Sequence, residues 1–137
     1  MIFYSNRKFK IWVYTVSHSS LLLRSVMQYG DEEGYSEETS YNIDLEFSFV
    51  EYMDVKTTWD SISISVVEKE NLRSDLKEKF DSYEGKIFEI ESNKEKTYIV
   101  AYSVLIGTNK WGLDDRIFNY NINLKHDEIL VSFPYES

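Results

Sequence analysis

Residues 42–67, NIDLEFSFVEYMDVKTTWDSISISVV, alternate apolar and polar side chains in two successive runs. The alternating apolar residues are Ile43, Leu45, Phe47 and Phe49 in the first run, and Ile62, Ile64 and Val66 in the second. This period of two is typical of β-strands that bury one face and expose the other. Parallel strands covered on both faces read as nearly continuous apolar runs, so the polar positions favour antiparallel pairing.

The first run contains an irregularity after Phe49. The apolar residues change parity there to Val50 and Tyr52, which would turn their side chains to the opposite face of the sheet. We therefore predict a bulge or the end of a strand near Phe49. The polar residues of the same run, which include Asp44 and Glu46, are expected on a solvated face.

The rest of the chain predicts further strands and one helix. Strands are expected at residues 9–14, 21–28, 86–91, 96–107, 118–124 and 129–133. Polar clusters at residues 17–20 and 92–95 predict hairpin turns. Between these strands, residues 70–83 change to a helical period, with the apolar stripe Leu72, Leu76, Phe80 and Tyr83. We expect Asn71 to cap the start of this helix and Gly85 to follow its end in the left-handed conformation.

These patterns predict an α+β, mostly β fold. We expect an antiparallel sheet, or a partly closed barrel or sandwich, of about seven or eight strands with the helix at about 70–83 on it. The 137 residues suit a single domain spanning residues 1–137. The absence of cysteine excludes disulfides, thiolate metal ligands and a cysteine nucleophile.

The charge of the chain restricts its partners. Fifteen basic and 24 acidic residues give a formal charge of −9, which repels nucleic acids and anionic membranes and favours a basic protein partner. Arg7, Lys8, Lys10 and Trp12 combine basic and aromatic side chains, but this cluster is short. We expect no nucleic-acid binding, no membrane segment and no export signal, in a cytoplasmic, bacterial protein.

Residues 29–41, which we name the acidic loop, contain two glycines, five acids and no basic residue. This composition predicts a mobile surface loop. An EF-hand starting at Asp31 would need glycine at its sixth position and glutamate at its twelfth, where the chain has Ser36 and Asn42. We therefore expect neither a metal site nor a cofactor.

Catalytic motifs are scarce in this chain. His18 and His126 are the only histidines, and neither has a metal-binding spacing or a G-x-S-x-G serine nearby. A general base would be His126 assisted by Asp127 or Glu128, but adjacent residues of an extended chain point to opposite faces. We lean towards a protein without enzymatic activity, and a small hydrolase with a histidine and a carboxylate stays an alternative.

Aromatic side chains beside acids are the remaining functional signal. Rings supply binding energy at protein interfaces, and charges on the rim steer association. The candidate binding residues are Tyr29, Asp31, Glu32, Glu33, Tyr35, Trp59, Trp111, Asp114 and Asp115. We predict a small interaction protein that binds a basic protein, as an inhibitor or immunity protein does. A domain that binds a small molecule or carbohydrate is the alternative. The oligomeric state is not determined, because the unpaired edges of an open sheet would allow a homodimer.

Overall fold

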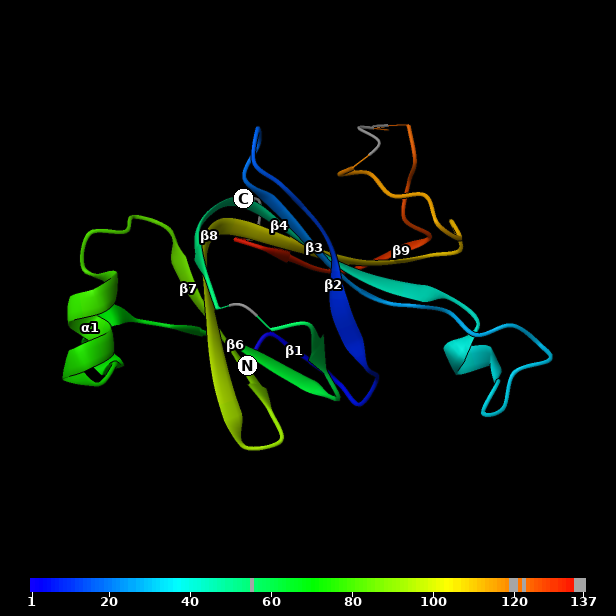
Figure 1. The fold of residues 1–137 in the computed structure, drawn as a ribbon, viewed down its shortest axis with the longest axis horizontal. Helices are drawn as coiled ribbons and strands as arrows, with labels where there is room; N and C mark the ends of the chain where they lie inside the picture. The colour runs from blue at the N-terminus through cyan, green and yellow to red at the C-terminus, as the bar shows by residue number, and fades with distance from the viewer. Residues whose placement is uncertain (55, 119–120, 122, 135–137) are drawn as a thin grey trace.

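The computed structural model describes residues 1–54, 56–118, 121 and 123–134 (Figure 1). Within these residues, nine strands form one antiparallel sheet, together with one α-helix and two 3₁₀ helices. The elements in chain order are β1 (Phe3–Ser5), β2 (Phe9–Thr15), β3 (Ser20–Ser25), η1 (Glu37–Thr39), β4 (Asn42–Met53), β5 (Thr58–Trp59), β6 (Ile62–Val67), η2 (Lys69–Asn71), α1 (Ser74–Phe80), β7 (Lys86–Ser92), β8 (Glu95–Asn109) and β9 (Glu128–Phe133). The predicted mostly β, antiparallel class with one helix is confirmed.

The sheet is open and is not closed into a barrel. Its strand order is β1-β6-β7-β8-β4-β3-β2-β5, and β9 pairs with β8 beyond the end of β7. Strand β5 is the last in this order and β6 is the second, yet only Asp60 and Ser61 separate them in the chain. The two sides of the sheet therefore approach each other at this point. The main core accordingly contains residues from both ends, such as Phe9 and Ile64, around Phe47 and Phe88. We call the sheet face that bears this core the inner face.

The predicted bulge near Phe49 is confirmed. Phe49 has a φ of +53°, and the register between β4 and β8 shifts between Val50 and Tyr52. As a result Phe47 and Val50 both belong to the inner core, whereas Tyr52 packs on the other side of the sheet, the outer face. The bulge therefore lets one strand contribute to two apolar clusters.

Strand β8 changes parity as well. Ile99, Ala101, Val104 and Ile106 all belong to the inner core, so the side chains do not follow a single alternation from 98 to 106. Tyr98 and Val100 therefore lie on the other face of the strand from Val104 and Ile106, although all four would share one face in a regular strand. The change falls where the neighbour of β8 passes from β7, paired up to Ala101, to β9, paired from Val104.

Helix α1 covers one end of the outer face. Phe80 is buried against Ile87, Tyr98 and Val100, and Leu76 lies partly buried beside it. The docking of the apolar stripe on the sheet is thus confirmed.

The helix itself is shorter than residues 70–83. Arg73 rather than Asn71 precedes its first turn, and Asn71 belongs to the separate 3₁₀ helix η2. The extended backbone of Leu72 divides the two helices while its side chain still reaches the same cluster. Gly85 is not a left-handed cap: a Cβ there would lie 2.9 Å from the carbonyl carbon of Ala101, so glycine permits close approach of the backbone to β8.

The connection between β8 and β9, residues 110–127, covers the other end of the outer face. No strand occurs among its described residues, so the prediction of a strand over 118–124 is wrong where the structure describes it; residues 119, 120 and 122 lie outside the described residues. Asp44 and Glu46 of β4 are buried beneath this connection, and their predicted solvated face is therefore wrong. A strand-like alternation at 118–124 was not sufficient for a strand, because alternation describes the side chains and does not by itself supply a hydrogen-bonding partner.

Candidate functional site

The acidic loop joins β3 to β4 and is closed by its own hydrogen bonds. At its neck the Gln28 N–H donates to the Thr39 carbonyl (2.7 Å), and Arg7 Nη2 donates to the Tyr41 carbonyl (2.8 Å). Farther out, the Tyr29 N–H donates to Glu32 Oε1 and the Glu32 N–H donates back to the Tyr29 carbonyl, both at 2.9 Å. These bonds give the loop a defined shape at the end of the molecule opposite α1 (Figure 1).

The surface of the loop combines exposed rings with exposed acids. Tyr29 is 55% exposed and Tyr35 is 44% exposed. Both rings line a hollow of about 560 Å³, together with Met27, Glu37 and Lys110. The acids Asp31, Glu32, Glu33, Glu37 and Glu38 are exposed, and none of them is in an ion pair within the described part of the chain. Their negative charge is therefore not neutralised by an ion pair among the described residues, and Lys110 is the basic residue that lines the hollow.

Trp59 does not belong to this surface. Its side chain is 2% exposed and lies in the inner core, where its indole N–H donates to Thr97 Oγ1 at 3.1 Å. This candidate binding residue is thus buried, because β5 pairs with β2 and turns the ring inward.

Trp111, Asp114 and Asp115 belong to the β8–β9 connection, which starts at Lys110 beside the hollow of the acidic loop. Trp111 is half-buried, with its ring 4.7 Å from the imidazole of His126. Asp115 is buried, and its carboxylate accepts hydrogen bonds from the two N–H groups that follow in its turn, those of Ile117 and Phe118. Asp114 has an exposed side chain, while its carbonyl accepts from Arg24. Of the nine predicted binding residues, only the five in the acidic loop form one continuous exposed surface.

A buried ion pair lies beneath the β8–β9 connection. Arg24 of β3 and Asp44 of β4 face each other in register, and both side chains are completely buried. The guanidinium donates to both carboxylate oxygens, at 2.6 and 2.9 Å. It also donates to the carbonyls of Gly112 and Asp114, at 3.0 and 2.9 Å, and lies over the ring of Trp12. The pair thus fixes the connection to the sheet through charge-assisted hydrogen bonds.

Amide side chains extend this network to His126. Asn42 donates to Asn109 Oδ1 (2.9 Å), and Asn109 Nδ2 donates to Asp44 Oδ2 (2.9 Å). The same amide nitrogen lies 3.4 Å from His126 Nδ1, and His126 Nε2 lies 3.2 Å from Glu46 Oε2. Because an amide nitrogen only donates, Nδ1 accepts and the proton of a neutral imidazole is on Nε2. Arg116 Nη1 lies 3.4 Å from the other oxygen of Glu46.

The histidine and carboxylate required for a hydrolase thus occur together, but with Glu46 in place of Asp127 or Glu128. The imidazole is fully buried, and both of its nitrogens have partners within the protein. A substrate proton would have to reach a nitrogen that is enclosed and already bonded. This geometry favours a structural role. His18, the other histidine, is exposed in the β2–β3 turn, where Nδ1 lies 2.9 Å from Ser17 Oγ.

The buried network is the part of the molecule that the sequence interpretation missed. Arg24 ends a run of three leucines in a strand, and a single charge in such a run signals a buried partner. The structure also explains Gly107. A Cβ there would lie 2.5 Å from the ring of His126, so only glycine lets this ring lie against β8. Neither residue identifies Asp44 or Glu46 as the partners, because those come from another strand.

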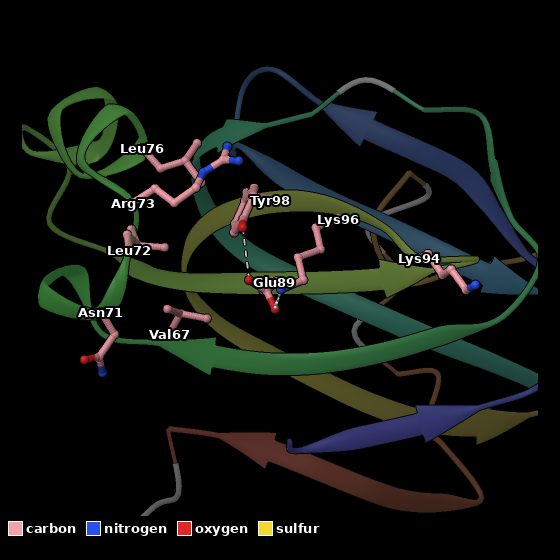
Figure 2. Close-up of a pocket in the computed structure, with 9 residues that line it drawn as sticks. All are labelled: Val67, Asn71, Leu72, Arg73, Leu76, Glu89, Lys94, Lys96 and Tyr98. Carbon is pink, nitrogen blue, oxygen red and sulfur yellow. Dashed lines mark hydrogen bonds and ion pairs between the residues drawn. The ribbon is translucent and has the colours of Figure 1, made fainter.

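A groove of about 410 Å³ lies between α1 and the β7–β8 hairpin (Figure 2). Figure 2 shows Leu72 and Leu76 at its helix end and Lys94 at the hairpin turn. At its centre Glu89 accepts a hydrogen bond from the Tyr98 hydroxyl (3.0 Å) and lies 3.7 Å from Lys96. Burial, with the Glu89 hydrogen bond second, raises the pKa of Tyr98 to about 12. The polar groups at the centre of the groove, Glu89, Lys96 and Tyr98, are therefore engaged with one another.

The described residues contain no group of three or more histidine or acidic side chains arranged to hold a metal ion. None of the helices within the described ranges has the length and apolar character needed to cross a membrane. Comparisons with protein-family models, with curated proteins and with solved structures find no match to this chain.

Proposed function

We propose that this protein binds a basic protein through its acidic loop, as an inhibitor or an immunity-like protein does. One observation carries the proposal: five exposed acids without an ion pair among the described residues lie beside the exposed rings of Tyr29 and Tyr35. The charge is expected to steer a cationic partner, and the rings are expected to supply contact area once it has docked.

The shape of the loop supports the same proposal. Its neck and its turn are closed by hydrogen bonds, so the backbone that carries the two rings need not be ordered when a partner binds. Preorganisation of this kind improves affinity because less conformational entropy is lost on association. The absence of cysteine suits an intracellular setting, and we place this activity in the bacterial cytoplasm.

The test compares the acidic loop with another acidic surface of equal charge. Asp31→Lys/Glu33→Lys reverses two loop acids whose side chains make no hydrogen bond or ion pair within the described residues. Glu70→Lys/Glu78→Lys reverses two exposed acids near α1 and serves as the matched control. Each purified protein is used to capture partners from a lysate of the source organism at low and high salt.

We expect the wild type and the control to retain one stoichiometric basic partner at low salt and to release it at high salt. The loop variant should bind that partner at least about tenfold more weakly in a titration. Equal weakening by both variants would show that only net charge matters, and an unchanged loop variant would contradict the proposal.

A further inference from the structure

Phe49 has a backbone conformation that its residue type does not favour. Four described residues other than glycine have positive φ, and Ser19, Asn93 and Lys94 all lie in hairpin turns. Phe49, with φ +53°, is the one that lies inside a strand. Glycine is the residue expected at such a bulge, and a bulky side chain there costs about 1 kcal/mol or more.

The bulge itself is required by the fold, but the phenyl ring is not. The Val50 N–H donates to the Ser19 carbonyl (2.8 Å), which fixes the bend, and Val50 then packs in the inner core. Glycine or asparagine would make the same bend at lower cost. The ring of Phe49 is 64% exposed, so its burial does not compensate the cost.

The ring instead forms an exposed aromatic pair. Its nearest aromatic neighbour is Tyr102 of β8, 47% exposed, with ring centroids 5.7 Å apart and planes tilted by 47°. Tyr102 follows the inner-core residue Ala101, so the pair lies on the outer face of the sheet, and both rings are accessible. A cross-strand aromatic pair adds about 0.2–1 kcal/mol to the stability of a sheet. Both rings here also keep an accessible face to which a partner can bind.

Two carboxylates are held beside the rings. The Tyr102 hydroxyl donates to Glu84 Oε2 (3.3 Å), and Glu84 raises the pKa of Tyr102. Glu51 Oε1 accepts from the N–H groups of Gly85 (2.6 Å) and Glu84 (3.1 Å), so its carboxylate is fixed at the same place. Lys86 faces Ala101 in the register, one residue before Tyr102, and therefore projects to the opposite face. The rings are thus rimmed by negative charge.

We infer that Phe49 and Tyr102, with Glu51 and Glu84, bind an arginine side chain of a protein partner. A guanidinium group stacks flat on an aromatic face while its planar fork pairs with carboxylate oxygens, whereas an ammonium group is a compact, strongly hydrated point charge that cannot stack in this way. This surface is separate from the acidic loop and rests on its own observations.

The test replaces Phe49 with residues that adopt its positive φ more readily than phenylalanine does. Phe49→Asn and Phe49→Gly relieve the left-handed strain, and Tyr4→Ala removes an exposed ring of β1 as the matched control. Fluorescence anisotropy measures the affinity of labelled hexa-arginine and hexa-lysine for each full-length protein, and thermal melts report stability. The ratio of the two affinities separates ring stacking from general attraction to an acidic protein.

We expect the wild type to bind hexa-arginine about tenfold more tightly than hexa-lysine. Phe49→Asn and Phe49→Gly should lose this preference while melting at the same or a higher temperature. Tyr4→Ala and Asp31→Lys/Glu33→Lys should keep the preference, which distinguishes this surface from the acidic loop. Equal binding of the two peptides to the wild type, a retained preference in the Phe49 variants, or a melting temperature lowered by several degrees would overturn the inference.

Discussion

Two segments cover the outer face of the sheet, α1 at one end and the β8–β9 connection at the other, and different interactions hold them in place. Helix α1 docks through an apolar cluster centred on the buried ring of Phe80. The β8–β9 connection docks through charges and amides, with Arg24 and Asp44 completely buried between it and the sheet. One sheet face is therefore covered by non-directional apolar contact at one end and by directional hydrogen bonds at the other.

This difference decides how each cover responds to change. Apolar contact loses free energy roughly in proportion to the area or volume removed, and the neighbours partly close the gap. A buried charge network depends on every partner, since a charge left alone keeps its full desolvation cost. The β8–β9 connection should accordingly be the more fragile cover towards single substitutions.

The largest effect is expected from Asp44→Ala, which leaves the buried guanidinium of Arg24 without its carboxylate. We expect a loss of about 3 to 5 kcal/mol in the free energy of unfolding, measured by urea denaturation. The double variant Arg24→Met/Asp44→Leu should recover only part of this loss, because it removes both buried charges but leaves the carbonyls of Gly112 and Asp114 without their donor. A loss below about 1 kcal/mol in the single variant would show that water or neighbouring groups replace the carboxylate.

Phe80→Ala tests the apolar cover. Removal of this buried ring should cost about 3 kcal/mol in the same urea measurements, at the lower end for core phenylalanines because Tyr52 and Tyr83 beside it are only partly buried. Leu76→Ala, at a half-buried position of the same stripe, should cost less. A change within 0.5 kcal/mol for Phe80→Ala would show that α1 contributes nothing to the fold.

The smallest effect on the free energy of unfolding is expected from the ionisation of Tyr98, which lies beneath α1, at alkaline pH. Because the pKa of Tyr98 is raised to about 12, the folded protein holds the phenolic proton more tightly than the unfolded chain does. The resulting stability is fully present below about pH 10 and is lost as the pH rises from there through about 12. Between pH 9 and 11.5 the wild type should lose about 1 to 2 kcal/mol more than Tyr98→Phe in urea melts. Parallel profiles for the two proteins would contradict this assignment.

The fold was largely predictable because its signals are local. Alternation in residues 42–67, the parity change at Phe49 and the stripe through Leu76 and Phe80 each lie within a few neighbouring residues. The strand predicted over 118–124 failed because alternation does not provide a neighbouring strand with a free edge. The helix ends failed because Leu72 reaches its cluster from an extended backbone.

The candidate site was predictable only in part. The acids and tyrosines of the loop are exposed as expected, since a stretch with little apolar surface has nothing to bury. Trp59 and Asp115 were candidate binding residues because of their neighbours in sequence, but both are buried, and their environment is set by β2 and by the turn at 115–118. Phe49 was read as a core residue, and only its φ and exposure reveal it as a surface ring.

By itself the sequence determined the antiparallel class, the helix on the sheet and the unpaired acids of residues 29–41, because period and composition act over short distances along the chain. Only the tertiary structure decided that Asp44 and Glu46 are buried, that His126 meets Glu46 across 80 residues, and that Phe49 stands beside Tyr102. Those outcomes depend on strand register and on which segment crosses the outer face, and both are set by contacts between residues far apart in the chain.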